Sequence, residues 1–178
     1  MRGYKAQRPV EEHVAIVALL ILLALSMHAH CPGALVGAPV THWATVPSLP
    51  AKPGEHPLHR ILNNSGPGRE LHLAAAANVQ YPRDVSPDHF SIDDQLPQGS
   101  HVLLIDDTWT GGGHAQSAVL ALRRAGATYV SVLEVARWIN EDFGDNARFV
   151  RELSSKDYNL AICPWTGGSC PARPGQRA

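Results

Sequence analysis

The chain has 178 residues, enough for one domain with a substantial hydrophobic core. Its 15 basic and 16 acidic residues nearly cancel, which argues against a surface for nucleic acid or anionic membranes, because such surfaces need clustered positive charge. A hydrophobic content of 44% excludes a wholly disordered chain, and three cysteines are too few for a disulfide framework, which fits a reducing compartment.

Residues 1–33 are expected to form an N-terminal apolar helix that packs on the domain. Residues 14–27 are a Leu- and Ala-rich run after a mildly basic start. Glu11 and Glu12 stand directly before this run, where a signal peptide prefers positive charge, and the run is short for a membrane span. A packed helix is therefore favoured, and a signal or membrane-anchor segment stays open as the alternative.

Residues 34–163 are expected to form the main α/β domain, followed by an irregular tail over 164–178. Residues 70–79 fit a strand and a helix about equally well. The polar stretch 80–100 is predicted to be a long surface loop of the kind that is usually functional or mobile. Shorter elements are predicted as a strand over 41–46, a helix over 56–63, a helix over 146–153 and an edge strand over 158–163.

The clearest pattern in the chain lies between residues 101 and 135. Residues 101–105 are a short apolar run typical of a fully buried strand in a parallel sheet. A glycine-rich turn follows, then helical spacing of apolar residues over 114–124, and then a second buried strand over 129–135. Strand, helix and strand in this order predict a βαβ unit, and hence a parallel twisted sheet flanked by helices.

Two carboxylates and a glycine loop stand at the end of the first of these strands. Asp106 and Asp107 follow the apolar run, at the edge where open α/β sheets bind ligands. Residues 111–113 are all glycine and let the backbone approach a ligand closely, while the helix that follows directs free N–H groups into the loop. The segment therefore predicts a phosphate site beside carboxylates that suit sugar hydroxyls or a metal, and a sugar phosphate satisfies both.

Three other nucleotide or phosphate motifs fit this segment poorly. A Walker A loop needs a lysine after its last glycine, and none follows here. A dinucleotide fingerprint needs spaced glycines directly after the strand, whereas these are consecutive. A receiver domain needs a phosphoacceptor aspartate at a later strand end, where this chain has Cys163.

The segment resembles the PRPP-binding motif of type I phosphoribosyltransferases. Asp106, Asp107, Thr110 and Gly112 match the motif, while Gly111 replaces its second threonine and Trp109 its usual aliphatic residue. Over residues 40–140 the chain is similar to the branch that includes ComF-like competence proteins and amidophosphoribosyltransferase-like domains. That branch has an N-terminal cysteine-rich zinc module, which this sequence lacks.

The resemblance implies a single phosphoribosyltransferase-like α/β domain that binds PRPP with Mg²⁺. It further implies transfer of the phosphoribosyl group to a nitrogen acceptor, with release of pyrophosphate. Mg²⁺ is expected mainly on substrate oxygens, with Asp106 and Asp107 as further candidate ligands. The implied roles are ribose binding by Asp106 and Asp107, with Asp107 also a candidate base; 5′-phosphate binding by Thr108, Trp109, Thr110, Gly111, Gly112, Gly113 and His114; and pyrophosphate binding by Pro47, Ser48, Leu49 and Lys52.

Lysine is rare in the chain, so the pyrophosphate side has few obvious cations. Arg60, Arg69 and Arg83 are candidates to compensate for this. The alternative is a non-catalytic, PRPP-sensing or regulatory protein of the same fold. In either case we expect a cytoplasmic protein, a candidate homodimer, that binds a small molecule and neither nucleic acid nor membrane.

The cysteines lie far from the glycine loop in sequence. Cys163 and Cys170 are separated by six residues, which is not the short knuckle of a structural zinc site, and no later histidine or cysteine completes a set. His28 and His30, beside Cys31, are the only tight group of histidines. We expect Cys163 and Cys170 to be a structural or incidental pair, with a metal site and a disulfide as the alternatives.

Overall fold

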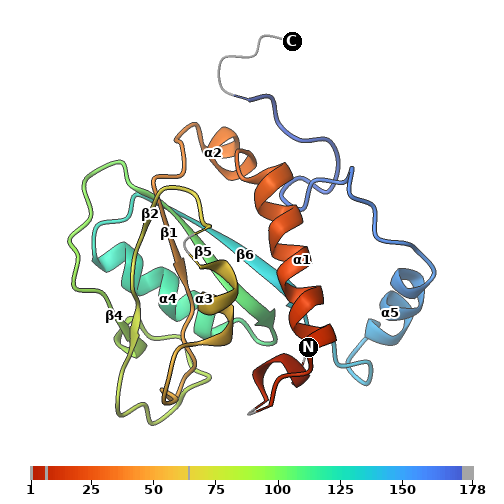
Figure 1. Cartoon of the computed structure of the whole chain (residues 1–178), viewed down its shortest axis with the longest axis horizontal. Coiled ribbons are helices and arrows are strands. Elements are labelled where there is room, and N and C mark those ends of the chain that lie inside the picture. Colours follow the sequence, from red (N-terminus) through yellow and green to blue (C-terminus); the bar gives the residue numbers. More distant parts are fainter. Residues whose placement is uncertain (1, 7, 64, 174–178) are drawn as a thin grey trace.

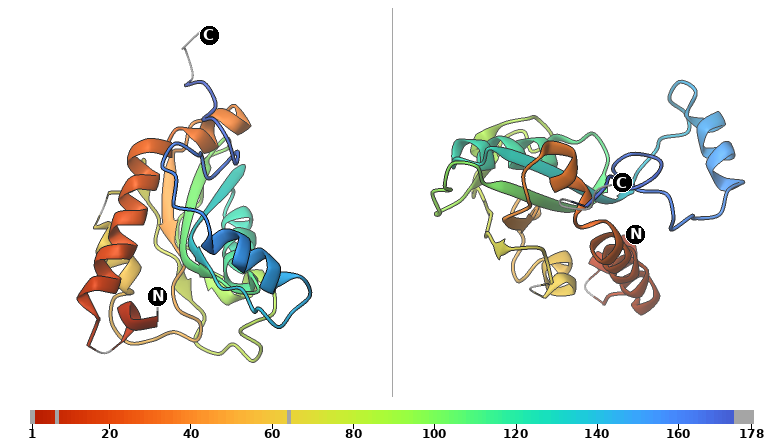
Figure 2. Two further views of the ribbon diagram at one scale, coloured as in Figure 1. Left: turned by 90° about the vertical axis from the view of Figure 1, so that its right-hand side faces the viewer. Right: turned by 90° about the horizontal axis from the view of Figure 1, so that it is seen from above.

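A parallel four-stranded sheet with helices on both faces organises the chain (Figures 1 and 2). The computed structural model describes residues 2–6, 8–63 and 65–173. The strand order is β2-β1-β5-β6, and a separate antiparallel pair is formed by β3 and β4. The predicted α/β class is confirmed. In chain order the elements are η1 (Arg2–Lys5), α1 (Glu11–His28), α2 (Cys31–Val36), β1 (His42–Thr45), α3 (Pro57–Leu62), β2 (Arg69–Glu70), β3 (Ala74–Ala75), η2 (Pro87–His89), β4 (Phe90–Ser91), β5 (His101–Trp109), α4 (Gly113–Arg124), β6 (Tyr129–Arg137) and α5 (Asn146–Ser154).

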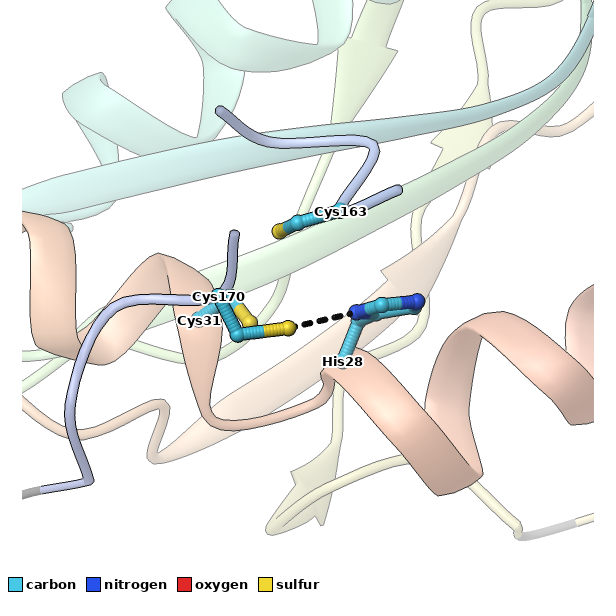
Figure 3. A group of neighbouring side chains, drawn as sticks. All are labelled: His28, Cys31, Cys163 and Cys170. Carbon is cyan, nitrogen blue, oxygen red and sulfur yellow. Dashed lines mark hydrogen bonds between the residues drawn. The ribbon is translucent and has the colours of Figure 1, made fainter. Parts of the chain in front are cut away.

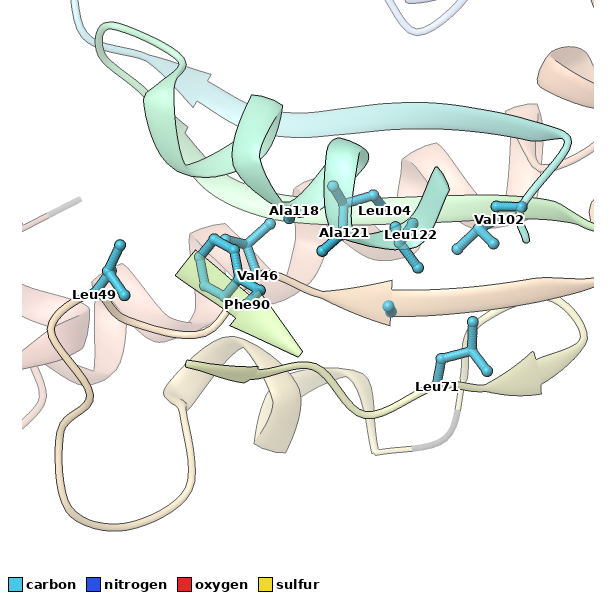
Figure 4. Packing of buried hydrophobic residues seen from close by; sticks show 11 residues of the cluster. Val46, Leu49, Leu71, Phe90, Val102, Leu104, Ala118, Ala121 and Leu122 are labelled. Atoms are coloured by element: carbon cyan, nitrogen blue, oxygen red, sulfur yellow. The ribbon is translucent and has the colours of Figure 1, made fainter. Parts of the chain in front are cut away.

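The central strand β5 is buried on both faces, and its alternating side chains divide the core in two. Val102 and Leu104 lie in one cluster with Leu122 of α4 (Figure 4). Leu103 and Ile105 lie in the other, with Trp43 and residues of α1 and α3. Because successive side chains of a strand point to opposite faces, this division sets the direction of every later side chain on β5. Seen from above in Figure 2, α4 covers one face of the sheet, and α1 and α3 lie on the other.

Helix α1 forms where the apolar run predicts it, but only one stripe of it is buried. Val17 and Ile21 are buried against the sheet, whereas Ile16, Leu19 and Leu22 are between 46% and 62% exposed. Among the described residues, helix α1 is thus buried along one stripe and no second layer covers its outer face. By length and composition alone α1 is apolar enough to cross a membrane.

Several predicted boundaries are corrected. Residues 158–163 form no strand, because no neighbouring strand lies beside them to pair with. Residues 70–79 are neither one strand nor one helix; they contain the last residue of β2 and the short strand β3. The stretch 80–100 is not wholly irregular, since η2 and β4 form within it and bury His89 and Phe90.

Candidate functional site

Strand β5 runs four residues further than the apolar run predicts, so Asp106 and Asp107 lie within it rather than after it. Both are buried, at 9% and 3% exposure. Since neighbouring side chains alternate, Asp107 projects to the face covered by α1 and α3, and Asp106 to the face covered by α4. The strand therefore supplies one carboxylate to each side of the sheet edge.

Asp107 is covered by the N-terminal segment of the chain. The Tyr4 hydroxyl donates a hydrogen bond to Asp107 Oδ2, and the Lys5 ammonium forms an ion pair with the same oxygen. Burial, together with the charge of Asp107, raises the pKa of Tyr4 well above its usual range. The phenol therefore stays protonated and acts as a donor.

His56 completes the surroundings of Asp107 as a neutral side chain. Its Nε2 lies 4.0 Å from Asp107 Oδ2. Burial, helped by the Lys5 charge, lowers the pKa of His56 to about 4. Its Nδ1 accepts a hydrogen bond from the backbone N–H of Leu58, which caps α3, so Nε2 carries the proton. The cationic partner of Asp107 is consequently Lys5 and not His56.

Asp106 faces Glu134 of the neighbouring strand, a residue that sequence reasoning missed. The two are register partners across β5 and β6, and both Glu134 carboxylate oxygens are buried without a hydrogen-bond partner among the described residues. Burial, reinforced by the Asp107 charge, raises the pKa of Asp106 to about 7. Burial and the charge of Asp106 raise the pKa of Glu134 to about 8. The sequence feature that could have pointed to Glu134 is that it is the one acidic residue within the predicted buried strand 129–135.

The glycine loop turns directly from β5 into α4. Thr108 and Trp109 belong to the strand, and only Thr110 and Gly111 are exposed at the turn. Gly112 is the N-cap residue of α4 with a φ of 79°, and the Trp109 ring occupies the space that a side chain there would need. His114, in the first turn, is half-buried, and its burial lowers the pKa of its imidazole.

A segment of the long loop lies over the start of α4. The carbonyl oxygen of Arg83 approaches Gly113 so closely that a Cβ there would clash with it. The loop is held by Ser117 of α4, which is fully buried. The Ser86 N–H donates to Ser117 Oγ at 3.0 Å, and the Ser117 hydroxyl lies 3.3 Å from both the Asp84 carbonyl and His89 Nδ1. This end of the stretch predicted to be mobile is therefore fixed to α4.

Ser117→Ala is expected to lower the free energy of unfolding by about 1–2 kcal/mol, because it removes these contacts and leaves a half-buried N–H unpaired. Urea denaturation measures the change. Ser154→Ala in α5, whose hydroxyl donates to the Val150 carbonyl at an exposed position, is the matched control and should change stability by less than about 0.5 kcal/mol. Equal losses in the two variants would contradict the role of Ser117.

A cavity of about 330 Å³ is lined in part by Lys5 and His56, the two residues beside Asp107 on the α3 side of the sheet. Leu49 is not part of its lining, because this side chain packs in the α4-side core cluster. Arg69 is not available to it either, since its guanidinium binds Asp94 at 3.0 Å. The lining includes Pro47, Ser48, Lys52, Lys5 and His56. The structure thus brings three of the four predicted pyrophosphate residues to one cavity, with two lysines.

The carboxylates at this sheet edge suit a hard divalent cation such as Mg²⁺, which prefers oxygen ligands. The unpartnered oxygens of Glu134, beside Asp106, are the observation that supports the fit. A cation there would replace the protons that the two acids otherwise retain. Asp107, already paired with Lys5, is the less suitable ligand.

No protein-family model matches the chain, and no curated protein matches its sequence. Among solved structures, the chain is similar to an allosteric regulatory enzyme of purine biosynthesis, with 20% identity and a TM-score of 0.44 over 69% of this chain but only 26% of that one. It is also similar to an adenine phosphoribosyltransferase, with 15% identity and a TM-score of 0.44 over 87% of this chain and 79% of that one. The Saccharomyces cerevisiae adenine phosphoribosyltransferase gives 13% identity, a TM-score of 0.40 and coverage of 90% and 83%. Likenesses this distant assign no function, which has to be argued from the residues of the site.

Proposed function

We propose that this chain binds PRPP together with Mg²⁺ and transfers the phosphoribosyl group to a nitrogen acceptor, releasing pyrophosphate. The observation that carries the proposal is the end of β5. There, a carboxylate on each face of the sheet is followed, after three further residues, by a glycine turn into the N-terminus of α4. Lys52 and Lys5, the partner of Asp107, line one cavity.

Each part of the site suits one part of the substrate. Backbone N–H groups from Thr110 to His114 and the helix dipole of α4 would hold the 5′-phosphate. Asp106 and Asp107 would accept hydrogen bonds from the ribose hydroxyls. The cavity with Lys52 would take the pyrophosphate, whose leaving charge its ammonium group stabilises.

Asp106 and Glu134 would hold Mg²⁺, whose charge would stabilise the negative charge of the bound substrate at this sheet edge. The protein's own contribution is mainly positioning and electrostatic stabilisation. Asp107 is placed to take the proton from a nitrogen nucleophile once Lys5 and Tyr4 have moved away from it. Substrate binding therefore has to displace the N-terminal segment from this carboxylate.

Calorimetric titration of the full chain with PRPP tests the proposal. We expect saturable binding that needs Mg²⁺ and releases protons at pH 7, because Asp106 and Glu134 hold protons that the cation would replace. The proton release is measured as a dependence of the binding enthalpy on the ionisation enthalpy of the buffer. A folded chain that binds no PRPP, with or without Mg²⁺, would refute the proposal.

A non-catalytic, PRPP-sensing protein is the second candidate, favoured by the covering of Asp107 by Tyr4 and Lys5. A ligand that displaces these residues would move the N-terminal segment, which is what a sensor requires. The two candidates differ in one measurement. A transferase releases pyrophosphate when nitrogen acceptors such as free nucleobases, ammonia or glutamine are added, whereas a sensor binds PRPP and leaves it intact.

We also propose that residues 1–33 act as a hood over the site and that the chain works in the cytoplasm, where PRPP is found. The contact of Tyr4 and Lys5 with Asp107 supports the first point. Cell fractionation tests whether the chain is cytoplasmic. Because one face of α1 is apolar and exposed, the chain could instead be recovered in the membrane fraction, and that result would contradict the proposal. The tail stays a proposed irregular segment; its residues 164–173 contain no helix or strand, and 174–178 lie outside the described residues.

A further inference from the structure

Three cysteines and a histidine from opposite ends of the chain meet at one place (Figure 3). His28 ends α1 and Cys31 begins α2, while Cys163 and Cys170 lie in the irregular C-terminal segment. One ligand atom from each side chain lies within 4.8 Å of all the others. Cys163 and Cys170, expected to be a structural or incidental pair, thus lie together with a third cysteine and a histidine.

We propose that His28, Cys31, Cys163 and Cys170 form a structural zinc site. Three thiolates and one imidazole are a ligand set of closed, tetrahedral zinc sites. Ideal bonds of about 2.3 Å to sulfur and about 2.0 Å to nitrogen place two sulfurs about 3.8 Å apart and a sulfur and a nitrogen about 3.5 Å apart. The group lies within reach of these spacings, and His28 Nδ1 is already 3.2 Å from Cys170 Sγ.

The surroundings of the sulfurs suit thiolates bound to a metal. Cys31 and Cys163 are fully buried, and His28 is 4% exposed. The backbone N–H groups of Trp165 and Thr166 are directed at Cys163 Sγ, and His30 Nε2 lies 3.7 Å from Cys31 Sγ. Donors of this kind orient zinc ligands and offset their negative charge.

The zinc site also explains why the C-terminal segment is held against the domain. Residues 155–173 form no helix or strand, and Cys163 is the only fully buried residue among them. Apolar packing of this segment is limited to Cys163 and the partly buried Trp165, whereas a bound metal supplies folding free energy directly. The metal would join the C-terminal segment to the end of α1. His28 and Cys170, two of its ligands, are 142 positions apart in the sequence.

A disulfide explains the cluster less well. It would use two of the three sulfurs and leave the third sulfur and the histidine without a partner. All three cysteines are free thiols in the structure. A zinc site uses all four side chains and is stable in a reducing compartment.

The test is metal analysis of the full chain, purified without a histidine tag and without chelators. We expect one zinc per chain. We also expect that Co²⁺ added to the metal-free protein gives the absorption bands of a tetrahedral thiolate site, and that Zn²⁺ abolishes them. Less than about a tenth of a zinc per chain in fully reduced protein, or a mass lower by two hydrogens that shows a disulfide, would overturn the proposal.

Variants separate the four ligands from their neighbours. Cys170→Ser changes the exposed ligand and is expected to remove at least nine-tenths of the zinc without unfolding the domain; Cys163→Ser should do the same. Ser169→Ala is the matched control, since Ser169 lies beside Cys170 and its side chain is exposed and outside the group, and it should keep the full zinc content. Zinc retained by both serine variants, or lost by Ser169→Ala, would refute this ligand set. None of these readouts depends on PRPP, so failure of the proposed function leaves the test intact.

Discussion

Replacing Asp106 and Asp107 together by asparagine is expected to weaken Mg²⁺-dependent PRPP binding by at least about 100-fold. Each carboxylate would lose charge-assisted hydrogen bonds to a ribose hydroxyl, worth roughly 1.5–3 kcal/mol apiece. Asp106 would also be lost as a cation ligand beside Glu134. Calorimetric titration with PRPP at saturating Mg²⁺ measures the effect.

The chain contains its own control for this double substitution. Glu141 and Asp142 are an adjacent acidic pair in the exposed turn that follows β6. Changing both to their amides also removes two neighbouring carboxyl groups but leaves Asp106 and Asp107 unchanged, so PRPP affinity should stay within about twofold. Equal affinity in the wild type and the Asp106→Asn, Asp107→Asn variant would remove both residues from the site.

The two single variants separate the faces of the sheet. Asp107→Asn removes the partner of Tyr4 and Lys5, so its loss of affinity is partly offset by release of the N-terminal segment. Asp106→Asn releases no covering segment, so its loss of affinity is not offset. Of the two single variants, only Asp106→Asn should reduce the proton release that accompanies Mg²⁺ binding. If Asp107→Asn were the more damaging of the two, the covering of Asp107 would not compete with substrate.

Local patterns in the sequence predict the centre of the fold well. The apolar run before Asp106 places the start of β5, and the glycines after it place α4 to within one residue, because burial on both faces and a helix start are both properties of short segments. The continuation of β5 to Trp109 is not visible locally. It depends on β6, which pairs with it as far as Arg137.

What the sequence does not predict depends on tertiary structure. Residues 158–163 have the composition of a strand but no strand beside them, so they stay irregular. Glu134 gains its importance only from the register that sets it opposite Asp106. The group around Cys31 exists only because the C-terminal segment returns to the end of α1.

Glu134→Gln is expected to stabilise the protein at pH 8 and to leave its stability unchanged at pH 4. In the unfolded chain Glu134 and Asp106 ionise near pH 4, whereas in the folded chain their pKa values are about 8 and about 7. Below pH 4 both groups are protonated in both states and contribute no difference. Between pH 4 and pH 8 the folded state retains protons that the unfolded state releases, so the stability of the wild type falls as pH rises through this window.

The size of the gain follows from the raised pKa, reduced for the partial exposure of Glu134. We expect about 2 kcal/mol at pH 8, measured by urea denaturation at the two pH values. Glu152→Gln in α5, an exposed glutamate paired with Arg148, is the control and should show a change below about 0.5 kcal/mol. A gain from Glu134→Gln that is the same at both pH values would show that its carboxyl is not held protonated in the folded protein.

Magnesium connects this stability effect to the proposed function. If Asp106 and Glu134 hold the cation, Mg²⁺ binds the folded state with both groups ionised and offsets their repulsion. Added Mg²⁺ should then raise the stability of the wild type at pH 8, and its effect should be much smaller in Glu134→Gln, where one ligand is neutral. Equal stabilisation of the two proteins would place the cation elsewhere, on the substrate alone, and would leave Glu134 as a buried acid whose role is to keep a proton.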